Sequence, residues 1–592
     1  MKKLKVLLVG INSQYVHSNL AIRYLKAYTK DLDYNSVIKE FSINDRVERI
    51  LEELIREKAD IIAFSCYIWN REMVRGLSKL IKLVDERIEI IYGGPEVSFD
   101  GREFLEKNEG EYLIEGEGEE TFRSLIKYKI RGKGPYSVDD EDAFSDKCRL
   151  IVNNQTINKE EDIPLNIEGL FYKKGKEVFY GGIRSNIDIN QVVFPYDEED
   201  ELDNKIVYYE ASRGCPFRCK YCLSSVDRNI RFRDIEKVKK ELGYLMDKKV
   251  RLVKFVDRTF NCDEKFATGI WEFLTNQDTE TKFHFEISAN ILTNNQVNVL
   301  SKAPKGRFQF EVGVQTTNNQ ILKNINRYIS FEDVAEKVKE VKALGNISQH
   351  LDLIAGLPGE DFHSFKNSFN QVYSIRPEEI QLGFLKILKG SPMMDEKDKW
   401  EMKYSPYPPY EILKTKDISY EELLVLKKVE SVVDKYYNSG KFNTVLEYFE
   451  KQFDNPFDFY YSLGMFFDEK GYFSRNISNA EYYRVFLEFN SEKLRGENKA
   501  LRNIIKYDYL MFNKKKWIPE FLENENDKRW TKELREKVLS LNLDIDKNKL
   551  HVEKFTIDML NFVKTKEILD KITYLVYDEN NLNKIVDVTG LI

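Results

Sequence analysis

The sequence predicts an α/β protein built from three successive parts. Two separate stretches alternate strand-like apolar runs with amphipathic helical runs, the first within residues 1–132 and the second within residues 205–395. Such alternation is typical of parallel sheets covered by helices. The alternation is lost after about residue 396, where a mainly helical C-terminal domain is expected to extend to residue 592. A length of 592 residues accommodates three such domains at about 100–200 residues each.

Residues 1–132 are expected to form a Rossmann-like, doubly wound domain. The first strand is the buried run at residues 4–10, and a helix follows over residues 19–30 with its apolar side chains on one face. The pattern then repeats, with strands expected at 37–41, 61–65, 88–92 and 112–115 and helices at 47–58 and 72–84. Ligands of such sheets bind beyond the carboxyl ends of the strands.

Residues 133–204 interrupt the alternation and are interpreted as a connector. Lys173-Lys174-Gly175-Lys176 predicts a turn between two short strands within residues 170–180. The acidic run at residues 197–201 follows Pro195 and is expected to be a solvated linker.

Six strand–helix units within residues 205–395 predict a partial (β/α)6 barrel. The strands are expected at 206–211, 251–257, 282–289, 308–314, 349–355 and 379–387. Six units do not fill the eight positions of a closed TIM barrel, so the barrel should be open on one side. Functional residues are expected where these strands end.

The composition excludes several classes of protein. Hydrophobic residues make up 42% and charged residues 32%, which is typical of a globular chain rather than a disordered one. The net charge of −7 provides no global basic field for nucleic acid. No apolar run reaches the ~20 residues that span a bilayer, and we expect neither a signal peptide nor membrane association. Six cysteines do not make a secreted disulfide framework and favour a reducing, cytoplasmic location.

Three of the six cysteines are clustered, and their spacing predicts an iron–sulfur site. Cys215, Cys219 and Cys222 form a C-x3-C-x2-C motif just after the first predicted barrel strand. Structural zinc normally takes four ligands, and no fourth Cys or His lies nearby in the sequence. Three thiolates on one loop suit a [4Fe–4S] cluster with one iron left open. A zinc loop or chance spacing is the alternative.

This motif, with Tyr221 before the last cysteine, resembles the radical S-adenosylmethionine (SAM) superfamily. The resemblance implies that the cysteines hold a [4Fe–4S] cluster whose open iron binds the amino and carboxylate groups of SAM. It also implies reductive cleavage of SAM to methionine and a 5′-deoxyadenosyl radical, with flavodoxin or ferredoxin as electron donor.

The ends of the later barrel strands carry the other candidate SAM-binding residues. By the same resemblance, Gly356 and Pro358 belong to a Gly-Leu-Pro-Gly turn that packs near the adenine of SAM. The polar candidates for the SAM site are Tyr221, Glu286, Glu311, Gln315 and Arg327. The alternative for each polar barrel residue is a hydrogen bond within the barrel.

A hydroxyl and several glycines at neighbouring strand ends of residues 1–132 suit a long nucleotide tail. Glycine allows the ligand to approach the backbone closely. No Gly-x-Gly-x-x-Gly follows the first strand, which argues against a dinucleotide. The pattern resembles the cobalamin (vitamin B12) binding domain, with Tyr67 where that family has leucine. The residues that carry it are Ser65, Tyr67, Gly93, Gly94, Gly116 and Glu117.

His17 lies in the first loop of this domain. Cobalamin enzymes that use a histidine ligand carry Asp-x-His-x-x-Gly there, whereas this loop reads Tyr15-Val16-His17-Ser18-Asn19-Leu20. Because the partner acid and the glycine are missing, we expect a cobalt without a histidine ligand. His17 as a lower axial ligand is the alternative.

The remaining cysteines are Cys66, Cys148 and Cys262, each in a different segment. Radical SAM methylthiotransferases need further grouped cysteines, so a single cluster is expected. Cys66 is expected to be a small buried residue, and Cys262 is expected near the barrel mouth.

The C-terminal region resembles an uncharacterised subfamily of B12-binding radical SAM proteins with an extra domain of unknown function. Lys514-Lys515-Lys516-Trp517 is a candidate patch for an RNA or nucleotide substrate, or else a solvated helix end.

These resemblances together predict a cobalamin-dependent radical SAM enzyme that methylates an unactivated carbon of a small molecule or a modified nucleotide or RNA. One alternative is a radical rearrangement, cyclisation or oxidation without methylation. The other is a non-catalytic cobalamin sensor or carrier, which has no use for an oxygen-sensitive cluster.

Overall fold

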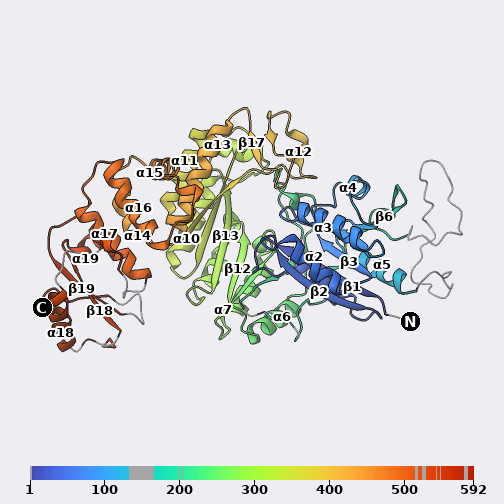
Figure 1. Ribbon diagram of the computed structural model, residues 1–592, viewed down its shortest axis with the longest axis horizontal. Coiled ribbons are helices and arrows are strands. Elements are labelled where there is room, and N and C mark those ends of the chain that lie inside the picture. The colour runs from blue at the N-terminus through green and yellow to red at the C-terminus, as the bar shows by residue number, and fades with distance from the viewer. Residues whose placement is uncertain are drawn as a thin grey trace. The chain divides into compact units, whose positions relative to one another are not determined.

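The computed structural model describes residues 3–131, 166–198, 200–202, 204–513, 518–522, 528–541, 543, 545–546, 549–578 and 585–591. The chain divides into two units (Figure 1). The first unit comprises Met1–Gly313, Leu322–Ser348 and Phe384–Thr415, and the second comprises Val314–Ile321, Gln349–Gly383 and Lys416–Ile592.

A seven-stranded sheet in the order β2-β1-β3-β4-β5-β6-β7 begins the first unit. Neighbouring strands among the first five pair in parallel, and β6 and β7 pair antiparallel. The strands are β1 (Lys5–Asn12), β2 (Asn35–Ser42), β3 (Ile61–Ser65), β4 (Glu89–Gly93), β5 (Tyr112–Ile114), β6 (Leu170–Lys174) and β7 (Glu177–Tyr180). The predicted hairpin at residues 170–180 is thus part of the N-terminal sheet.

Side chains of β1 enter two cores in alternation, which explains why this strand is apolar along most of its length. Leu7 and Val9 pack in one core and Val6 and Leu8 in the other. The first core contains side chains of α2 (Val47–Arg56), α3 (Arg71–Val84) and α4 (Gly101–Lys107), and the second contains side chains of α1 (Leu20–Tyr28) and α5 (Glu119–Arg131). Helices on both faces confirm the predicted doubly wound fold.

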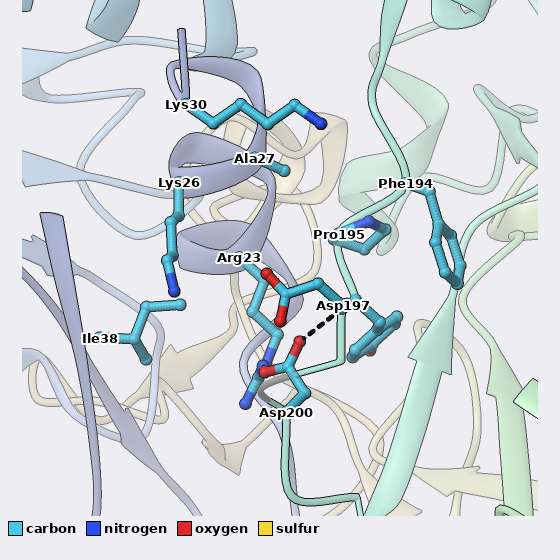
Figure 2. A pocket seen from close by; sticks show the side chains of 10 residues that line it. Arg23, Lys26, Ala27, Lys30, Ile38, Phe194, Pro195, Asp197 and Asp200 are labelled. Atoms are coloured by element: carbon cyan, nitrogen blue, oxygen red, sulfur yellow. Dashed lines mark hydrogen bonds and ion pairs between the residues drawn. The ribbon is translucent and has the colours of Figure 1, made fainter. Parts of the chain in front are cut away.

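The acidic run at residues 197–201 is not simply a solvated linker, and that expectation is wrong at Asp200. This carboxylate pairs with Arg23 of α1, and the Arg23 guanidinium also bonds Glu40 at 2.8 Å. Figure 2 shows Arg23 and Asp200 among the side chains that line a small pocket between α1 and residues 194–200. The segment is therefore held against α1 by an ion pair.

Four barrel strands lie mainly in the first unit, in the order β13-β12-β11-β8. They are β8 (Ile206–Tyr209), β11 (Leu252–Phe255), β12 (Lys282–Ile287) and β13 (Phe308–Gln315), and their neighbours pair in parallel. The principal helices that follow them are α6 (Ile235–Asp247), α7 (Glu264–Thr275), α8 (Asn294–Leu300), α9 (Asn319–Asn324) and α10 (Phe331–Leu344). Phe255, Phe285 and Phe310 of the strands pack with Phe260 and Trp271 in an aromatic core.

The segment Phe384–Thr415 of the first unit contains a short helix and a small antiparallel pair of strands. They are α12 (Pro392–Glu396) and an antiparallel pair, β16 (Lys403–Tyr404) with β17 (Ile412–Lys414). A second small pair, β9 (Ser212–Arg213) with β10 (Arg231–Phe232), encloses the predicted cluster loop.

The second unit contains the last two predicted barrel strands and the C-terminal region. Strands β14 (Ser348–Ala355) and β15 (Glu379–Phe384) are neighbours and are joined by α11 (Phe362–Ile375). The helices that follow are α13 (Tyr420–Val433), α14 (Asn443–Glu450), α15 (Pro456–Glu469), α16 (Asn479–Glu492), α17 (Asn498–Phe512), α18 (Lys528–Ser540) and α19 (Met559–Thr565). Phe449, Phe459, Phe486 and Phe489 form the centre of its aromatic core.

The C-terminal region also contains an antiparallel sheet that the sequence did not indicate. Its order is β18-β19-β20, with β18 (Leu550–Phe555), β19 (Thr573–Asp578) and β20 (Ile585–Asp587). The candidate patch at residues 514–517 and Cys148 lie outside the described residues. In the parts of the chain that are described, no helix is both long and apolar enough to cross a bilayer.

Glu360, in the second unit, gives a testable pH dependence. Its carboxyl is fully buried, accepts a hydrogen bond from Thr316 at 2.7 Å, and has its pKa raised by burial to about 8. The folded chain therefore retains a proton that the unfolded chain releases above pH ~4.5, so stability falls by up to about 1.4 kcal/mol per pH unit until pH ~8. We expect Glu360→Gln to remove part of this loss, measured as the thermal midpoint at pH 6 and pH 9. An equal midpoint drop in both proteins would contradict the assignment.

Candidate functional site

The loop that carries the three clustered cysteines leaves the barrel through a glycine. Gly214 has φ +95°, and a Cβ there would lie 2.5 Å from the carbonyl oxygen of Asn229, so only glycine fits. Cys215 and Cys219 are buried and Cys222 is half-buried. The thiol of Cys215 lies 3.6 Å from the hydroxyl of Thr259.

The backbone and the side chain of Lys220 both make contacts that hold the cysteine loop in place. The backbone N–H of Lys220 donates to Ile325 at 3.0 Å, and its carbonyl accepts from Met393 at 2.9 Å. The ammonium of Lys220 also pairs with Glu396 of α12 at 2.6 Å. Asn326 donates a further hydrogen bond to the carbonyl of Arg218 at 2.8 Å. The loop is thus braced before any ligand binds.

Arg327, a predicted SAM-site residue, brings positive charge to the cysteine loop. Its Nη1 lies 3.4 Å from the hydroxyl of Tyr221 and 4.0 Å from the sulfur of Cys219, and its Nη2 donates to the carbonyl of Gly313. Burial raises the pKa of the Cys219 thiol, and the Arg327 charge opposes that shift. A half-buried guanidinium beside the cysteine loop suits an anionic cluster.

The donor set fits an iron–sulfur cluster better than a single metal ion. Three thiols from one loop are the ligands that a [4Fe–4S] cluster with an open iron needs. Among the described residues, no three His, Cys, Asp or Glu side chains converge on a position for one metal ion. The assignment of Cys215, Cys219 and Cys222 to a cluster stays a prediction.

The predicted cobalamin-binding residues meet at the carboxyl ends of β3 and β4. Ser65 is buried, accepts a hydrogen bond from Asn19 at 2.9 Å, and donates to the carbonyl of Val9. Gly94 has φ +111°, and a Cβ there would lie 2.6 Å from the carbonyl oxygen of Cys66. Cys66 is fully buried, as expected.

The other predicted cobalamin-binding residues differ in how much free space surrounds them. Gly116 has φ +68° with open space around it, and a Cβ on Gly93 would make only ordinary contacts. Tyr67 stacks on Trp69 with ring centroids 4.5 Å apart. The indole of Trp69 donates to the carbonyl of Ile11 at 3.0 Å, which fixes the pair at the strand ends. Glycine backbone and an aromatic pair suit a large ligand at this edge of the sheet.

Glu117, another predicted cobalamin-binding residue, is paired with cations that precede and follow the cysteine loop. It forms an ion pair with Arg231 at 2.6 Å and lies 3.4 Å from Arg213. Arg213 in turn pairs with Glu119 at 2.6 Å and with Glu210 at 2.9 Å. This buried network joins the start of α5 to the residue before Gly214, and therefore joins the two predicted cofactor sites.

We expect Arg213→Gln to be strongly destabilising, because it leaves the buried Glu119 and the half-buried Glu210 without their cation. Breaking a buried pair of this kind costs about 3–5 kcal/mol. The matched control is Arg87→Gln, which removes an exposed pair with Asp85 and should leave stability unchanged. Thermal unfolding of the two variants compares them, and equal midpoints would contradict the role given to Arg213.

His17 already has a partner in the barrel. Its Nδ1 lies 2.7 Å from the hydroxyl of Tyr208, and its backbone pairs with Ile206 at the start of β8. Burial lowers the pKa of His17, and the charges of Lys254 and Lys205 lower it further, which keeps the imidazole neutral. The first loop of the N-terminal domain is therefore attached to the first barrel strand.

The inner face of the barrel strands carries the remaining candidates of the first unit. Glu311 accepts from His284 at 2.9 Å and from Lys254 at 3.1 Å, so its expected alternative, a hydrogen bond within the barrel, is observed. Burial would raise the pKa of Glu311, but the hydrogen bond from His284 and the charge of Lys254 hold it down to about 2. Glu286 lies opposite Glu311 in the register of β12 and β13. Cys262 lies near this mouth, half-buried, with its pKa raised by burial to about 11.

Three candidate SAM-binding residues belong to the second unit. Gln315 is buried with φ +71°, and its side-chain oxygen has no hydrogen-bond partner among the described residues. Gly356 has φ +84°, which the sharp turn after β14 requires, and Pro358 follows in that turn. The structure thus brings Glu286, Glu311 and Arg327 into one unit and Gln315, Gly356 and Pro358 into the other.

Family comparisons cover most of the chain. Residues 6–126 match the B12 binding domain, residues 209–372 match the radical SAM superfamily, and residues 398–577 match a protein of unknown function, DUF4080. The chain therefore carries a B12-binding domain followed by a radical SAM domain. The two predicted cofactor sites accordingly lie in its B12-binding domain and at the start of its radical SAM domain.

Curated relatives of this B12-binding radical SAM protein are distant. TokK of Streptomyces tokunonensis, a cobalamin-dependent radical SAM methyltransferase, is 21% identical over 415 residues, which cover 66% of this chain and 56% of TokK. The 2-(S-pantetheinyl)-carbapenam-3-carboxylate methyltransferase of Streptantibioticus cattleyicolor is 22% identical over 344 residues, covering 56% of this chain and 48% of that enzyme. The chain spans about half the length of the curated relatives it matches.

Solved structures show the same fold. OxsB, solved with aqua-cobalamin and SAM, has a TM-score of 0.56 and 16% identity, covering 86% of this chain and 79% of OxsB. TsrM from Kitasatospora setae, solved with cobalamin and a [4Fe–4S] cluster, has a TM-score of 0.53 and 14% identity, covering 69% of this chain and 82% of TsrM. The expected α/β architecture is therefore confirmed.

Sequence reasoning missed Arg213 and Lys254, which pair with carboxylates of the candidate site. Arg213 directly precedes Gly214 at the start of the cluster motif. Lys254 stands between the fully buried Val253 and Phe255 in β11. A charged residue between two buried apolar ones marks the inner face of a barrel strand, and this was the available signal.

Proposed function

We propose that this chain is a cobalamin-dependent radical SAM enzyme that methylates an unactivated carbon of its substrate. The observation that carries this proposal is one unit holding both the braced cysteine loop and the glycine-lined strand ends of the B12-binding domain. Two sites in one chain suit a reaction that needs both cofactors beside one substrate. A non-catalytic carrier has no use for the cysteine loop.

In this proposal each cofactor is held by residues already described. Cys215, Cys219 and Cys222 are the ligands of a [4Fe–4S] cluster. When bound, the cluster and SAM would supply a 5′-deoxyadenosyl radical, and cobalamin would supply the methyl group. Arg327 and Tyr221 neutralise and enclose the cysteine loop. The cobalamin-binding residues are Ser65, Tyr67, Gly93, Gly94 and Gly116, whereas Glu117 supports their loop through Arg231 and Arg213.

The limits of the proposed domains follow the sequence alternation. We assign residues 1–132 to cobalamin binding, 133–204 to a connector, 205–395 to the radical SAM barrel and 396–592 to the C-terminal domain. The hairpin β6–β7 of the connector completes the first sheet. The electron donor is expected to be a flavodoxin or ferredoxin, and the substrate a small molecule or a modified nucleotide or RNA. We expect a reducing, cytoplasmic location, because the spacing of the six cysteines does not predict a disulfide framework.

Product analysis after anaerobic reconstitution tests the function. The purified chain is supplied with iron, sulfide, hydroxocobalamin, SAM and a reductant, and a metabolite extract serves as the source of substrate. Formation of both 5′-deoxyadenosine and S-adenosylhomocysteine is the expected result. 5′-Deoxyadenosine alone would indicate radical chemistry without methylation, and the absence of both products would contradict an enzyme of this class.

A further inference from the structure

The loop that follows β4, residues 94–100, joins two of the predicted cobalamin-binding glycines. Its Ser98 hydroxyl donates a hydrogen bond to the carbonyl of Gly94 at 2.9 Å and accepts one from the backbone N–H of Gly116 at 3.2 Å. Both glycines have positive φ and supply backbone to the predicted site. The position of this loop, named here the β4 loop, therefore sets the position of the backbone that is predicted to meet cobalamin.

Two carboxylates of the β4 loop share one guanidinium. Arg71, at the start of α3, pairs with Glu96 at 2.8 Å and with Asp100 at 3.2 Å. Only 11% of the Arg71 side chain and 8% of the Glu96 side chain are exposed to solvent. Two negative charges beside one positive charge leave an excess of negative charge in a largely buried position, where a further cation or hydrogen-bond donor is stabilising.

A segment that follows β15, residues 385–412, supplies both a further cation and a further donor. The ammonium of Lys389 pairs with Asp100 at 2.5 Å. The buried phenol of Tyr410 donates a hydrogen bond to Glu96. Each carboxylate of the β4 loop thus has a second partner, and both of these partners come from outside the B12-binding domain. We name the segment the strap.

The two ends of the strap pair with each other through their backbones. The N–H of Ile387 donates to the carbonyl of Tyr410 at 3.0 Å, and the N–H of Ile412 donates to the carbonyl of Leu385 at 2.8 Å. These bonds hold Tyr410 beside the residues that precede Lys389. The ammonium and the phenol therefore approach the β4 loop from one firmly bonded backbone.

An apolar contact adds to these polar ones. Phe99 belongs to the β4 loop, and its ring packs against Gly390 of the strap. Gly390 has φ +78°, and a Cβ there would overlap the ring of Phe99, so this contact requires glycine. The β4 loop consequently meets the strap through three side chains, two of them charged and one aromatic.

The middle of the same strap braces the cysteine loop. The backbone N–H of Met393 donates to the carbonyl of Lys220 at 2.9 Å, and Glu396 pairs with the Lys220 ammonium at 2.6 Å. Met393 and Glu396 lie between Lys389 and Tyr410 in the sequence. All of these residues belong to the first unit. One segment of this unit therefore contacts both predicted cofactor sites.

We propose that the strap sets the position of the cobalamin site relative to the cysteine loop, with Lys389 and Tyr410 as its positioning residues on the cobalamin side. This inference deepens the proposed function and rests on it. Lys389 and Tyr410 act through Asp100 and Glu96 and do not themselves touch a cofactor. Two cofactors that act on one substrate need a fixed separation, because a small misplacement of reacting groups costs a large part of the rate.

Equilibrium dialysis with hydroxocobalamin tests the cobalamin side of the strap. In Tyr410→Phe and in Lys389→Met we expect the dissociation constant to rise about fivefold or more, because each variant removes one contact between the strap and a carboxylate of the β4 loop. Lys389→Arg keeps the cation and should bind like the unaltered protein. The thermal midpoint of the cobalamin-free protein is measured alongside, since a residue needed only for folding would lower that midpoint without changing the affinity of the folded fraction.

Pulsed electron paramagnetic resonance tests whether the strap also sets the separation of the two sites. The reconstituted holoenzyme, saturated with cobalamin, is reduced so that the cluster and cob(II)alamin each carry one unpaired electron. Their dipolar coupling then gives the distribution of distances between them. We expect a narrow distribution in the unaltered protein and in Lys389→Arg. The double variant Tyr410→Phe/Lys389→Met should give a clearly broader one.

Matched controls are Tyr404→Phe and Lys397→Met, which lie in the same strap. The hydroxyl of Tyr404 lies 3.4 Å from the sulfur of Met394, and Lys397 pairs with Asp398 at 3.7 Å, so neither contact involves the β4 loop. Both variants should behave like the unaltered protein in both measurements.

The proposal is overturned if Tyr410→Phe and Lys389→Met bind cobalamin as the unaltered protein does, if the controls weaken binding equally, or if the double variant keeps the narrow distribution of distances. An unaltered protein that binds neither cobalamin nor iron would instead contradict the proposed function. The two failures are therefore distinguishable.

Discussion

Replacement of Cys222 by alanine is expected to abolish both iron binding and 5′-deoxyadenosine formation. The three thiolates come from one short loop, and removing one leaves a cluster with two protein ligands. Because the chain contributes position and the cofactor contributes the chemistry, loss of the cluster leaves no residual radical reaction. Iron content, the broad visible absorption of the reconstituted protein and the 5′-deoxyadenosine yield measure the effect.

The matched control for Cys222 is Cys262→Ala. Cys262 is also half-buried and lies near the barrel mouth, but it stands outside the C-x3-C-x2-C motif. This variant should retain the iron, the absorption and the product. A Cys222→Ala protein that keeps its iron and forms product, or an unaltered protein that binds only zinc, would show that the cluster assignment is wrong.

Substitution of Gly94 by alanine is expected to cause the second large effect, a loss of cobalamin binding. At φ +111° a side chain is strained by about 1–3 kcal/mol. The added Cβ would also lie 2.6 Å from the oxygen and 3.1 Å from the nitrogen of Cys66, which are backbone atoms that cannot simply move away. The loops after β3 and β4 must separate, and each 1.4 kcal/mol lost from binding weakens it about tenfold. Equilibrium dialysis with hydroxocobalamin measures the change.

Gly76→Ala serves as the control for Gly94. Gly76 lies within α3, and a Cβ there meets no heavy atom within 4 Å. Alanine should stabilise this helix by about 0.5–1 kcal/mol and leave cobalamin binding unchanged. Equal cobalamin affinity in both variants would exclude a role for the Gly94 backbone in the site.

Much of the architecture was predictable because its signals are local. The strand predicted at residues 61–65 is β3, and the helix predicted at 72–84 is α3. Each of the six predicted barrel strands is also present within a few residues of its expected ends. The small sheet β18-β19-β20 was not predictable, because the helical segments around it dominate the pattern. The acidic run was misread at Asp200, since its partner Arg23 lies 177 residues away in the sequence.

The candidate site was predictable where a motif has one dominant chemical explanation. Three cysteines on one loop predict a soft metal site from their spacing alone. Single carboxylates have no such signature, so sequence could not separate Glu311, which accepts hydrogen bonds from His284 and Lys254, from Glu286, which does not. Glu117 is likewise predicted to bind a ligand from the sequence, which could not show that it pairs with Arg231 and lies near Arg213.

Residue order alone determined that this chain carries a strand–helix sheet, a second set of strand–helix units, and a sulfur-rich loop directly after the first of them. Those features depend on periodicity and on short spacing, which neighbouring residues specify. Only the tertiary structure decided which charged side chains form ion pairs and which do not. The reason is that an ion pair forms between side chains that folding brings together from distant parts of the sequence.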